Sequence, residues 1–216
     1  MKKKLFIALL ICVATIGLTG CNTTSTKKDD NKKSTKGTTI SIKDNSAYFV
    51  KISGKKFNAG EKISTISKAK LKQKDSDLDL TIPSNRYLSA YTVVNSSNQE
   101  VCKFVPLNVS DKTITVKDAV IGGFEVGENN YSKIKEETLA LNIEVAGGIK
   151  LGSTYDDIKK AFGKEDFKNE TTADPTFNIP AYTTYKYSYG YKGYEFIVDD
   201  SGKVSQIHWN NYDYDE

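Results

Sequence analysis

An aromatic run near the C-terminus, "YTTYKYSYGYKGYEFIV", constrains the fold of this 216-residue chain more than any other stretch. Tyr185, Tyr187 and Tyr189 recur with the two-residue period of a β-strand, so their side chains are expected on one face. Two further strands are expected over "YEFIV" and "KVSQIHW", joined by the turn "DDSG" at 199–202. The chain is therefore predicted to end in three antiparallel strands.

A short amphipathic helix is predicted before these strands, in "GSTYDDIKKAFGK". Thr154 is a suitable N-cap, and Asp157 stands three residues later, at the spacing of a capping box. Gly163 is a natural stop, because glycine adopts the backbone conformations that end helices. An apolar stripe recurs at helical spacing, formed by Tyr155, Ile158, Ala161 and Phe162.

The N-terminal half carries shorter strand signals. Strands are expected over "TISIK", "AYFVKIS", "KTITVKDAVIGGFEV" and "TLALNIEV", and a hairpin over 86–107 with "NSSNQ" as its loop. Shifted by 92 residues, "FNAGEKISTISKAK" lies over "IKLGSTYDDIKKAF", so an internal repeat is plausible. The predicted fold is α+β, with two tandem repeats that each pack a short helical element on an antiparallel sheet. The first repeat, in a domain at 38–137, is degenerate and strand-rich, and the second domain covers 138–216.

The N-terminus has the composition of a secretory leader. Three lysines precede the twelve-residue apolar run Leu5–Ile16, which is too short to span a membrane as a helix. The following Leu18, Thr19, Gly20 and Cys21 resemble the lipobox of bacterial lipoproteins. The resemblance implies removal of residues 1–20 by the lipoprotein signal peptidase and a diacylglyceryl group on the Cys21 sulfur. The lipid would hold the protein on the outer face of a bacterial cell membrane.

Residues 21–37 are expected to be a disordered tether, because they hold almost nothing apolar to bury. The formal charge of +4 arises from the leader and this polar stretch, since residues 47–216 hold 22 basic and 24 acidic residues. Nucleic-acid binding usually requires basic residues clustered on a domain face. A nucleic-acid partner is therefore excluded.

The C-terminal part also resembles a known repeat. The helix, the aromatic strands and "DDSGKV" are similar to the repeat of β-lactamase inhibitory protein and to small lipoproteins of the outer-membrane β-barrel assembly family. The similarity covers 148–209 well and 51–126 faintly. It implies a fold only, because the matching residues are capping and core positions: Ser153, Thr154, Asp157, Ile158, Phe162 and Gly163.

No catalytic, cofactor or metal motif occurs in the sequence, and one histidine with no thiol pair makes a metal cluster hard to build. Cys102 is expected to be a small buried hydrophobe. His208 and Trp209 are expected to pack on the sheet as a pair, and Asp199 and Asp200 to form a turn. We therefore expect no catalytic residue, no cofactor and no metal.

The tyrosines favour a binding role, because tyrosine offers a flat apolar face with a polar tip. The candidate binding surface consists of Tyr185, Tyr187, Tyr189, Tyr191 and Trp209. An aromatic-rich sheet whose rings pack across strands is the alternative. The expected partner, besides the membrane, is an envelope or extracellular protein or a cell-wall glycan.

Three functions remain open. The expected one is a non-enzymatic binding module outside the membrane, and a sharper form of it is an inhibitor of a secreted or envelope enzyme. The third is a hydrolase acting through Asp156 and Asp157. Neighbouring carboxylates in a helix diverge by about 100°, so they pair poorly for acid–base catalysis. A deep pocket with two carboxylates would favour the hydrolase, and an exposed tyrosine patch would favour binding.

Overall fold

The computed structural model describes residues 39–212, which belong to one compact unit. The predicted signal peptide at 1–20, the lipid site at Cys21 and the tether at 21–37 lie outside the described residues. Antiparallel strands and short helices make up the described part, as the α+β prediction requires.

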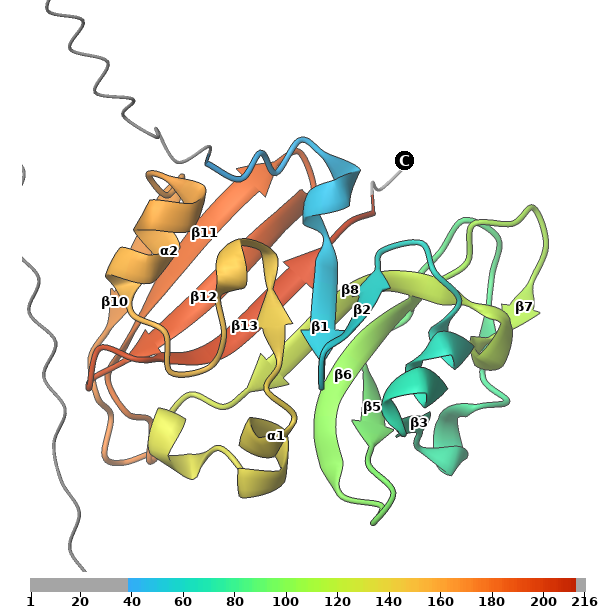
Figure 1. Ribbon diagram of the computed structural model, residues 1–216, viewed down its shortest axis with the longest axis horizontal. Helices are drawn as coiled ribbons and strands as arrows, with labels where there is room; N and C mark the ends of the chain where they lie inside the picture. Colours follow the sequence, from blue (N-terminus) through green and yellow to red (C-terminus); the bar gives the residue numbers. More distant parts are fainter. Residues whose placement is uncertain (1–38, 213–216) are drawn as a thin grey trace, which may run out of the picture. The chain divides into compact units, whose positions relative to one another are not determined.

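A large antiparallel sheet forms the centre of the fold (Figure 1). Among the described residues it has eight strands in the order β10-β11-β12-β13-β8-β6-β5-β3. Their bounds are β3 Lys72–Gln73, β5 Tyr91–Val94, β6 Glu100–Leu107, β8 Val120–Gly127, β10 Phe167–Thr171, β11 Tyr182–Tyr189, β12 Lys192–Asp199 and β13 Val204–Asn210. The sheet brings β8 beside β13, although about eighty residues of chain separate them.

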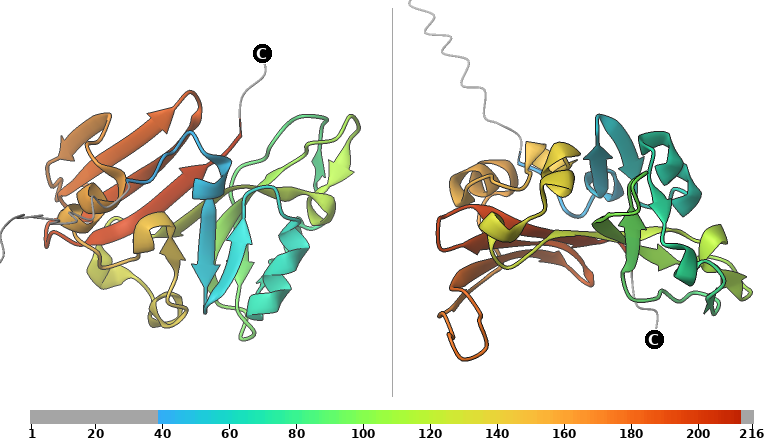
Figure 2. Two further views of the ribbon diagram at one scale, coloured as in Figure 1. Left: turned by 45° about the horizontal axis from the view of Figure 1, so that its top comes forward. Right: turned by 90° about the horizontal axis from the view of Figure 1, so that it is seen from below.

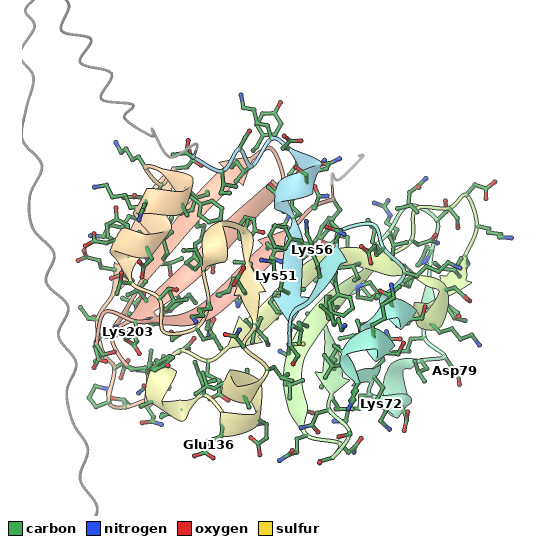
Figure 3. All side chains as sticks on the ribbon, in the orientation of Figure 1. Lys51, Lys56, Lys72, Asp79, Glu136 and Lys203 are labelled. Atoms are coloured by element: carbon green, nitrogen blue, oxygen red, sulfur yellow. The ribbon has the colours of Figure 1, made fainter. Side chains whose placement is uncertain are left out.

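One side of this sheet is covered by a second layer, as Figures 1 and 2 show. A three-stranded sheet in the order β2-β1-β9 lies there, beside the helices α2 and η2. The bounds in this layer are β1 Phe49–Ile52, β2 Lys55–Asn58, β9 Glu144–Val145, α1 Glu136–Ala140, α2 Tyr155–Phe162 and the 3₁₀-helix η2 Ile63–Ala69. Charged side chains such as those of Lys51 and Lys56 mark β1 and β2 in Figure 3.

The remaining elements are short. The strands β4 Thr81–Ile82 and β7 Ile114–Thr115 pair with each other. The other 3₁₀-helices are η1 Asn45–Ala47, η3 Asp75–Asp77, η4 Val116–Asp118, η5 Tyr131–Lys133 and η6 Ala146–Gly148.

The core lies between the large sheet and the covering layer. Phe162 of α2 places its ring 5.3 Å from that of Phe196 on β12, measured between centroids. Tyr194, also on β12, donates its buried hydroxyl to the carbonyl of Ala47 at 2.7 Å. Because strand side chains alternate between faces, the buried aromatic residues of β11, β12, β13, β8 and β6 gather on this covered face.

The predicted helix is confirmed as α2, Tyr155–Phe162. Thr154 and Asp157 form the full capping box: the Thr154 hydroxyl accepts from the Asp157 amide, and the Asp157 carboxylate accepts from the Thr154 amide. Gly163 follows the last helical residue with a φ of 85°. The three C-terminal strands are also confirmed, and β10 adds a fourth strand beside β11. The 86–107 hairpin is confirmed over β5 and β6.

Two strand predictions are wrong. "TISIK" is not a strand, because its backbone bonds to α2 instead: the Ile40 amide donates to the Ala161 carbonyl at 2.8 Å. "TLALNIEV" contains the end of α1 and only the two-residue strand β9, since Glu136 and Glu137 provide an acidic first turn for a helix.

The expected domain boundary between residues 137 and 138 does not divide the sheets. Strand β1 pairs with β9 from beyond this boundary, with Val50 opposite Val145. Strand β8 likewise pairs with β13, with Phe124 opposite Trp209. Both sheets therefore join the two halves of the chain into one compact unit.

Candidate interaction surface

The second face of the large sheet carries no covering layer (Figure 2). We call it the open face, and it holds the residues that alternate with the core residues along each strand. The loop joining β10 to β11 projects on this side of the sheet in the right view of Figure 2.

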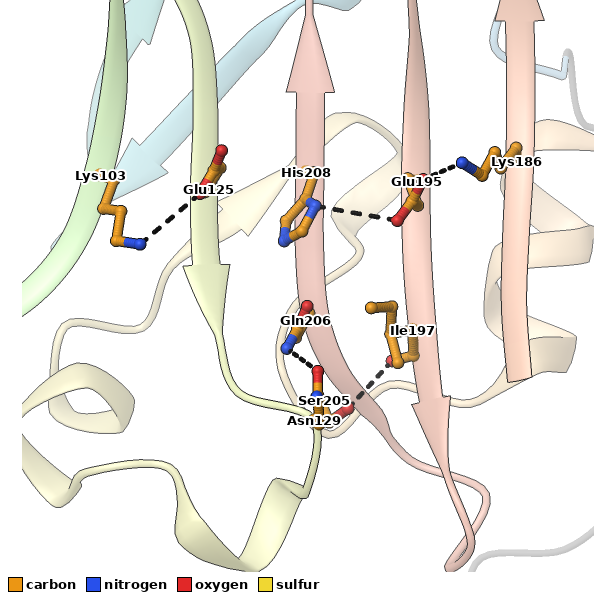
Figure 4. A network of polar contacts seen from close by, with 9 residues as sticks. All are labelled: Lys103, Glu125, Asn129, Lys186, Glu195, Ile197, Ser205, Gln206 and His208. Atoms are coloured by element: carbon orange, nitrogen blue, oxygen red, sulfur yellow. Dashed lines mark hydrogen bonds and ion pairs between the residues drawn. The ribbon is translucent and has the colours of Figure 1, made fainter. Parts of the chain in front are cut away.

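A row of side chains crosses the open face at one level (Figure 4). Strand register places the following residues side by side, from β10 to β5: Phe167, Lys186, Glu195, His208, Glu125, Lys103 and Thr92. We call its five middle members, Lys186, Glu195, His208, Glu125 and Lys103, the charged row. The row spans neighbouring strands from both halves of the chain.

Ion pairs link neighbours along the charged row. Lys186 Nζ lies 2.6 Å from Glu195 Oε2, and His208 Nδ1 lies 3.9 Å from Glu195 Oε1. On the other side, Lys103 Nζ lies 3.9 Å from Glu125 Oε2. Side-chain exposure in the row ranges from 27% to 53%, so every member reaches solvent. Exposed pairs of this kind add little to stability.

His208 occupies the centre of the row, between two carboxylates. Burial lowers the pKa of His208 below its ordinary value, because a charged imidazolium is poorly solvated there. Glu125 and Glu195 act in the opposite direction, while Lys103 and Lys186 lower the pKa further. A neutral imidazole at neutral pH can both donate and accept a hydrogen bond at this position.

Two hollows adjoin the row, and a third adjoins Gln206, two residues from His208 in β13. One of about 260 Å³ includes Lys103, Glu125 and His208 in its walls, together with Lys135. A second lies beside Glu195 and His208 and reaches Tyr191. A third includes Gln206 and lies under the β10–β11 loop, whose residues Phe177 and Ile179 line it.

Phe177 is 73% exposed, an unusual state for a phenylalanine. The open face therefore combines a charged centre, shallow hollows and an apolar margin.

The predicted tyrosine surface is largely wrong. Tyr185, Tyr187 and Trp209 lie on the covered face, and each is at most 7% exposed. The rings of Tyr155 and Tyr185 stack with centroids 4.3 Å apart, because α2 lies over that face of β11. Tyr187 packs similarly against Phe162.

Tyr189 and Tyr191 do lie on the surface, where β11 turns into β12, and they are 51% and 55% exposed. The Tyr189 ring lies 5.1 Å from Lys43 Nζ, measured from the centroid. Tyr191 contributes to one hollow beside the charged row. Only these two of the five predicted residues remain part of a candidate surface.

The predicted His208–Trp209 pair is also wrong, because consecutive strand residues point to opposite faces. Trp209 packs against Tyr48 in the core, whereas His208 belongs to the open face.

Two of the four carboxylates considered for catalysis or cation binding, Asp157 and Asp199, have structural contacts. Asp157 accepts from the Thr154 amide at 2.8 Å within the capping box. Asp199 accepts from the amides of Tyr131, Ser201 and Lys203, each at 3.0 Å, which fixes the predicted turn. Cys102 is buried, and burial raises the pKa of its thiol. In residues 39–212, no group of three or more His, Cys, Asp or Glu could hold a metal ion.

Sequence reasoning missed four members of the charged row. Lys103, Glu125, Lys186 and Glu195 each stand between apolar or aromatic neighbours, as in "VCKFV" and "GYEFI". A lone charge inside an otherwise apolar strand indicates an outward-facing position, and this signal was available. The alignment of these four residues in one row could not be predicted, because it depends on which strands become neighbours.

The described residues contain no helix long and apolar enough to cross a membrane. Comparison of the chain with protein-family models, curated proteins and solved structures found no match. The function of the open face is therefore inferred from its own residues and from the sequence of residues 1–21.

Proposed function

We propose that the chain is a bacterial lipoprotein whose folded part binds another protein through the open face, without catalysing a reaction. The observation that carries this proposal is the charged row, five solvent-accessible polar side chains aligned across an uncovered sheet face. Interfaces between proteins combine polar side chains with aromatic anchors, and Tyr191 supplies an exposed aromatic side chain beside the row.

The anchor is inferred from the leader. A twelve-residue apolar run behind three lysines, ending at Cys21, suits lipidation rather than a spanning helix. Two acyl chains hold a protein on a membrane stably, because each buried methylene contributes about 0.8 kcal/mol. The anchor would place the folded part on the outer face of the cell membrane.

A binding role is favoured over hydrolysis by the state of the carboxylates. Asp157 and Asp199 are held in local turns and caps, as described above. Glu125 and Glu195 are register neighbours of His208 on opposite sides, and each also lies within 4 Å of a lysine nitrogen. Carboxylates that are already paired with lysines suit recognition of a charged partner.

We also propose that the fold is built from two tandem repeats related to those of β-lactamase inhibitory protein. The strands Glu100–Leu107 and Lys192–Asp199 have the same length and are offset by 92 residues. The helices Ile63–Ala69 and Tyr155–Phe162 begin at the same offset. If β11, β12 and β13 of the second repeat correspond to β5, β6 and β8 of the first, the corresponding strands occur in the same order when the large sheet is followed inward from either end. An inhibitor is therefore a sharper form of the binding proposal, in which the partner is an enzyme.

The anchor is tested by growing the native bacterium with radioactive palmitate. The full chain should take up the label and sediment with membranes, whereas Cys21→Ser should lose the label and leave the membrane fraction. Cys102→Ser is the matched control and should keep the label, because this thiol is buried. A labelled Cys21→Ser protein would contradict the proposed anchor.

The binding face is tested by photo-cross-linking in the native bacterium. A photoreactive amino acid is placed at Thr92 on the open face or at Lys56 on the covering layer. We expect a distinct adduct from position 92 and none from position 56. Adducts only from position 56, or none from position 92 or from a second open-face site at Asn169, would contradict binding through the open face.

A further inference from the structure

The charged row has a palindromic order of charge. From β11 to β6 it reads cation, anion, histidine, anion, cation, in Lys186, Glu195, His208, Glu125 and Lys103. The two glutamates come from different halves of the chain, and each has a lysine on its outer side. The row therefore has a negative centre with positive flanks on both sides.

This order disfavours pairing of the open face with a second copy of itself. A two-fold axis through His208 along the strands would place Lys186 opposite Lys103 and Glu195 opposite Glu125. A two-fold axis along the row would place each residue opposite its own copy. Both arrangements juxtapose like charges, which is costly in an interface. A second copy whose row is centred on His208 is therefore a poor occupant of this face.

Uniformly charged or neutral ligands also fit badly. A polyanion would meet the two glutamates at the centre of the row, and a neutral glycan would desolvate the two ion pairs of the row without offering them any charge in return. A protein surface with charges of the inverse order places an opposite charge against each of the four charged side chains of the row. We propose that the partner is a protein surface with two cationic side chains between two anionic ones; this proposal rests on the proposed binding function.

The sheet sets the spacing of this complementary pattern. Neighbouring strands lie about 4.8 Å apart, so the two glutamates are about 10 Å apart along the row and the two lysines about 19 Å. A partner helix lying along the row matches these spacings if it carries two cationic residues seven positions apart, which is about 10.5 Å. Its acidic residues would then lie three or four positions before the first cation and after the second. Phe167 lies beside Lys186 at one end of the row, so an apolar group of the partner fits there.

Two synthetic peptides of identical composition test the pattern. Both are stapled helices: one carries Glu, Lys, Lys and Glu at positions 1, 4, 11 and 15, and the other exchanges every Glu with Lys. Binding to the purified full chain in detergent is measured by fluorescence anisotropy at low ionic strength and again in salt. We expect the first peptide to bind at least tenfold more tightly and to lose affinity in salt, because screening weakens exposed charges.

Variants show whether the charged row is responsible. The double variant Glu125→Lys with Glu195→Lys should abolish the preference, because all four charged positions of the row are then cationic. The neutral pair Glu125→Gln with Glu195→Gln should reduce it, because only the two lysines then discriminate between the peptides. The matched control is Asp111→Lys with Glu136→Lys, which changes the net charge equally at exposed sites outside the row. The control should keep the wild-type preference, and circular dichroism should show that all variants are folded.

Equal affinity for the two peptides, no binding of either, or a preference that the glutamate variants leave unchanged would overturn the charge pattern. A failure of the charge pattern can be distinguished from a failure of the binding function by comparing the peptide and cross-linking results. An adduct from position 92 without a peptide preference leaves binding through the open face standing and rejects only the charge pattern. A peptide preference without any adduct from the open face rejects the binding function in the cell.

Discussion

His208 and Trp209 follow each other in β13 and lie on opposite faces of the large sheet. Trp209 packs with its ring centroid 6.0 Å from that of Tyr48, in the core under the covering layer. His208 lies across from Glu195 and Glu125 on the open face. One strand therefore contributes a core anchor and the centre of the candidate interaction surface in adjacent positions.

Replacing His208 by glutamine should change how stability depends on pH. Burial lowers the pKa of folded His208 below the ordinary value of 6.5, so the unfolded chain binds more protons between those two values. The free energy of unfolding should therefore rise with pH across that window and level off above it. Urea unfolding between about pH 5 and pH 8, around the ordinary histidine range, should show a flatter profile for His208→Gln. An identical slope in both proteins would contradict the lowered pKa.

Alanine at Tyr187 and at Tyr189 should have very different effects on stability. Tyr187 is buried against Phe162, so Tyr187→Ala should lower the free energy of unfolding by about 3–5 kcal/mol. Tyr189 faces solvent on the same strand, so Tyr189→Ala should change it by no more than about 0.5 kcal/mol. Denaturant unfolding of both variants checks this, and equal losses would contradict the position of α2 over β11.

The capping box of α2 should contribute measurably to stability. Thr154→Ala removes the hydroxyl that accepts from the Asp157 amide, which should cost about 1 kcal/mol. Asp156→Ala is the matched control, since Asp156 lies in the same turn outside the capping box, and it should cost less than about 0.5 kcal/mol. Thermal unfolding should rank the two, and a larger loss for Asp156→Ala would rule out the cap as the cause.

Gly127 should not tolerate a side chain. Its φ is 98°, and a Cβ atom there would lie 1.9 Å from the Ser205 carbonyl oxygen, where β8 meets β13. Gly127→Ala should therefore lower the free energy of unfolding by about 3 kcal/mol or more, within the range of severe point mutations. Gly202→Ala is the control, because Gly202 also has a positive φ but nothing within 4 Å, and it should cost only about 1 kcal/mol. Similar losses in both would contradict the close approach of the two strands.

Local sequence was enough to predict α2 and the C-terminal strands. Thr154, Asp157 and Gly163 act within a few residues of one another, so helix start and stop can be read from spacing alone. The period of two in Tyr185, Tyr187 and Tyr189 likewise predicts one shared face. The same reasoning failed at 138–145, where short apolar segments fit a helix or a strand equally well.

The candidate site could be predicted only in part. A period of two indicates that two faces exist, but it does not say which of them another layer will cover. Tyr187 was assigned to a surface that α2 in fact covers. Conversely, Glu125 and Lys103 join His208 in one row only because β8 lies beside β13 and β6 beside β8.

By itself, the sequence determined the capped helix, the strand periodicity and the single charges within apolar strands, because each depends on neighbours a few residues away. Tertiary structure alone decided that β8 lies beside β13, so that Glu125 meets His208 and the charged row becomes continuous. Pairing between strands that are far apart in the sequence depends on the packing of whole layers. Here Phe124 and Trp209 are buried on the covered face, and their neighbours Glu125 and His208 therefore lie on the open face.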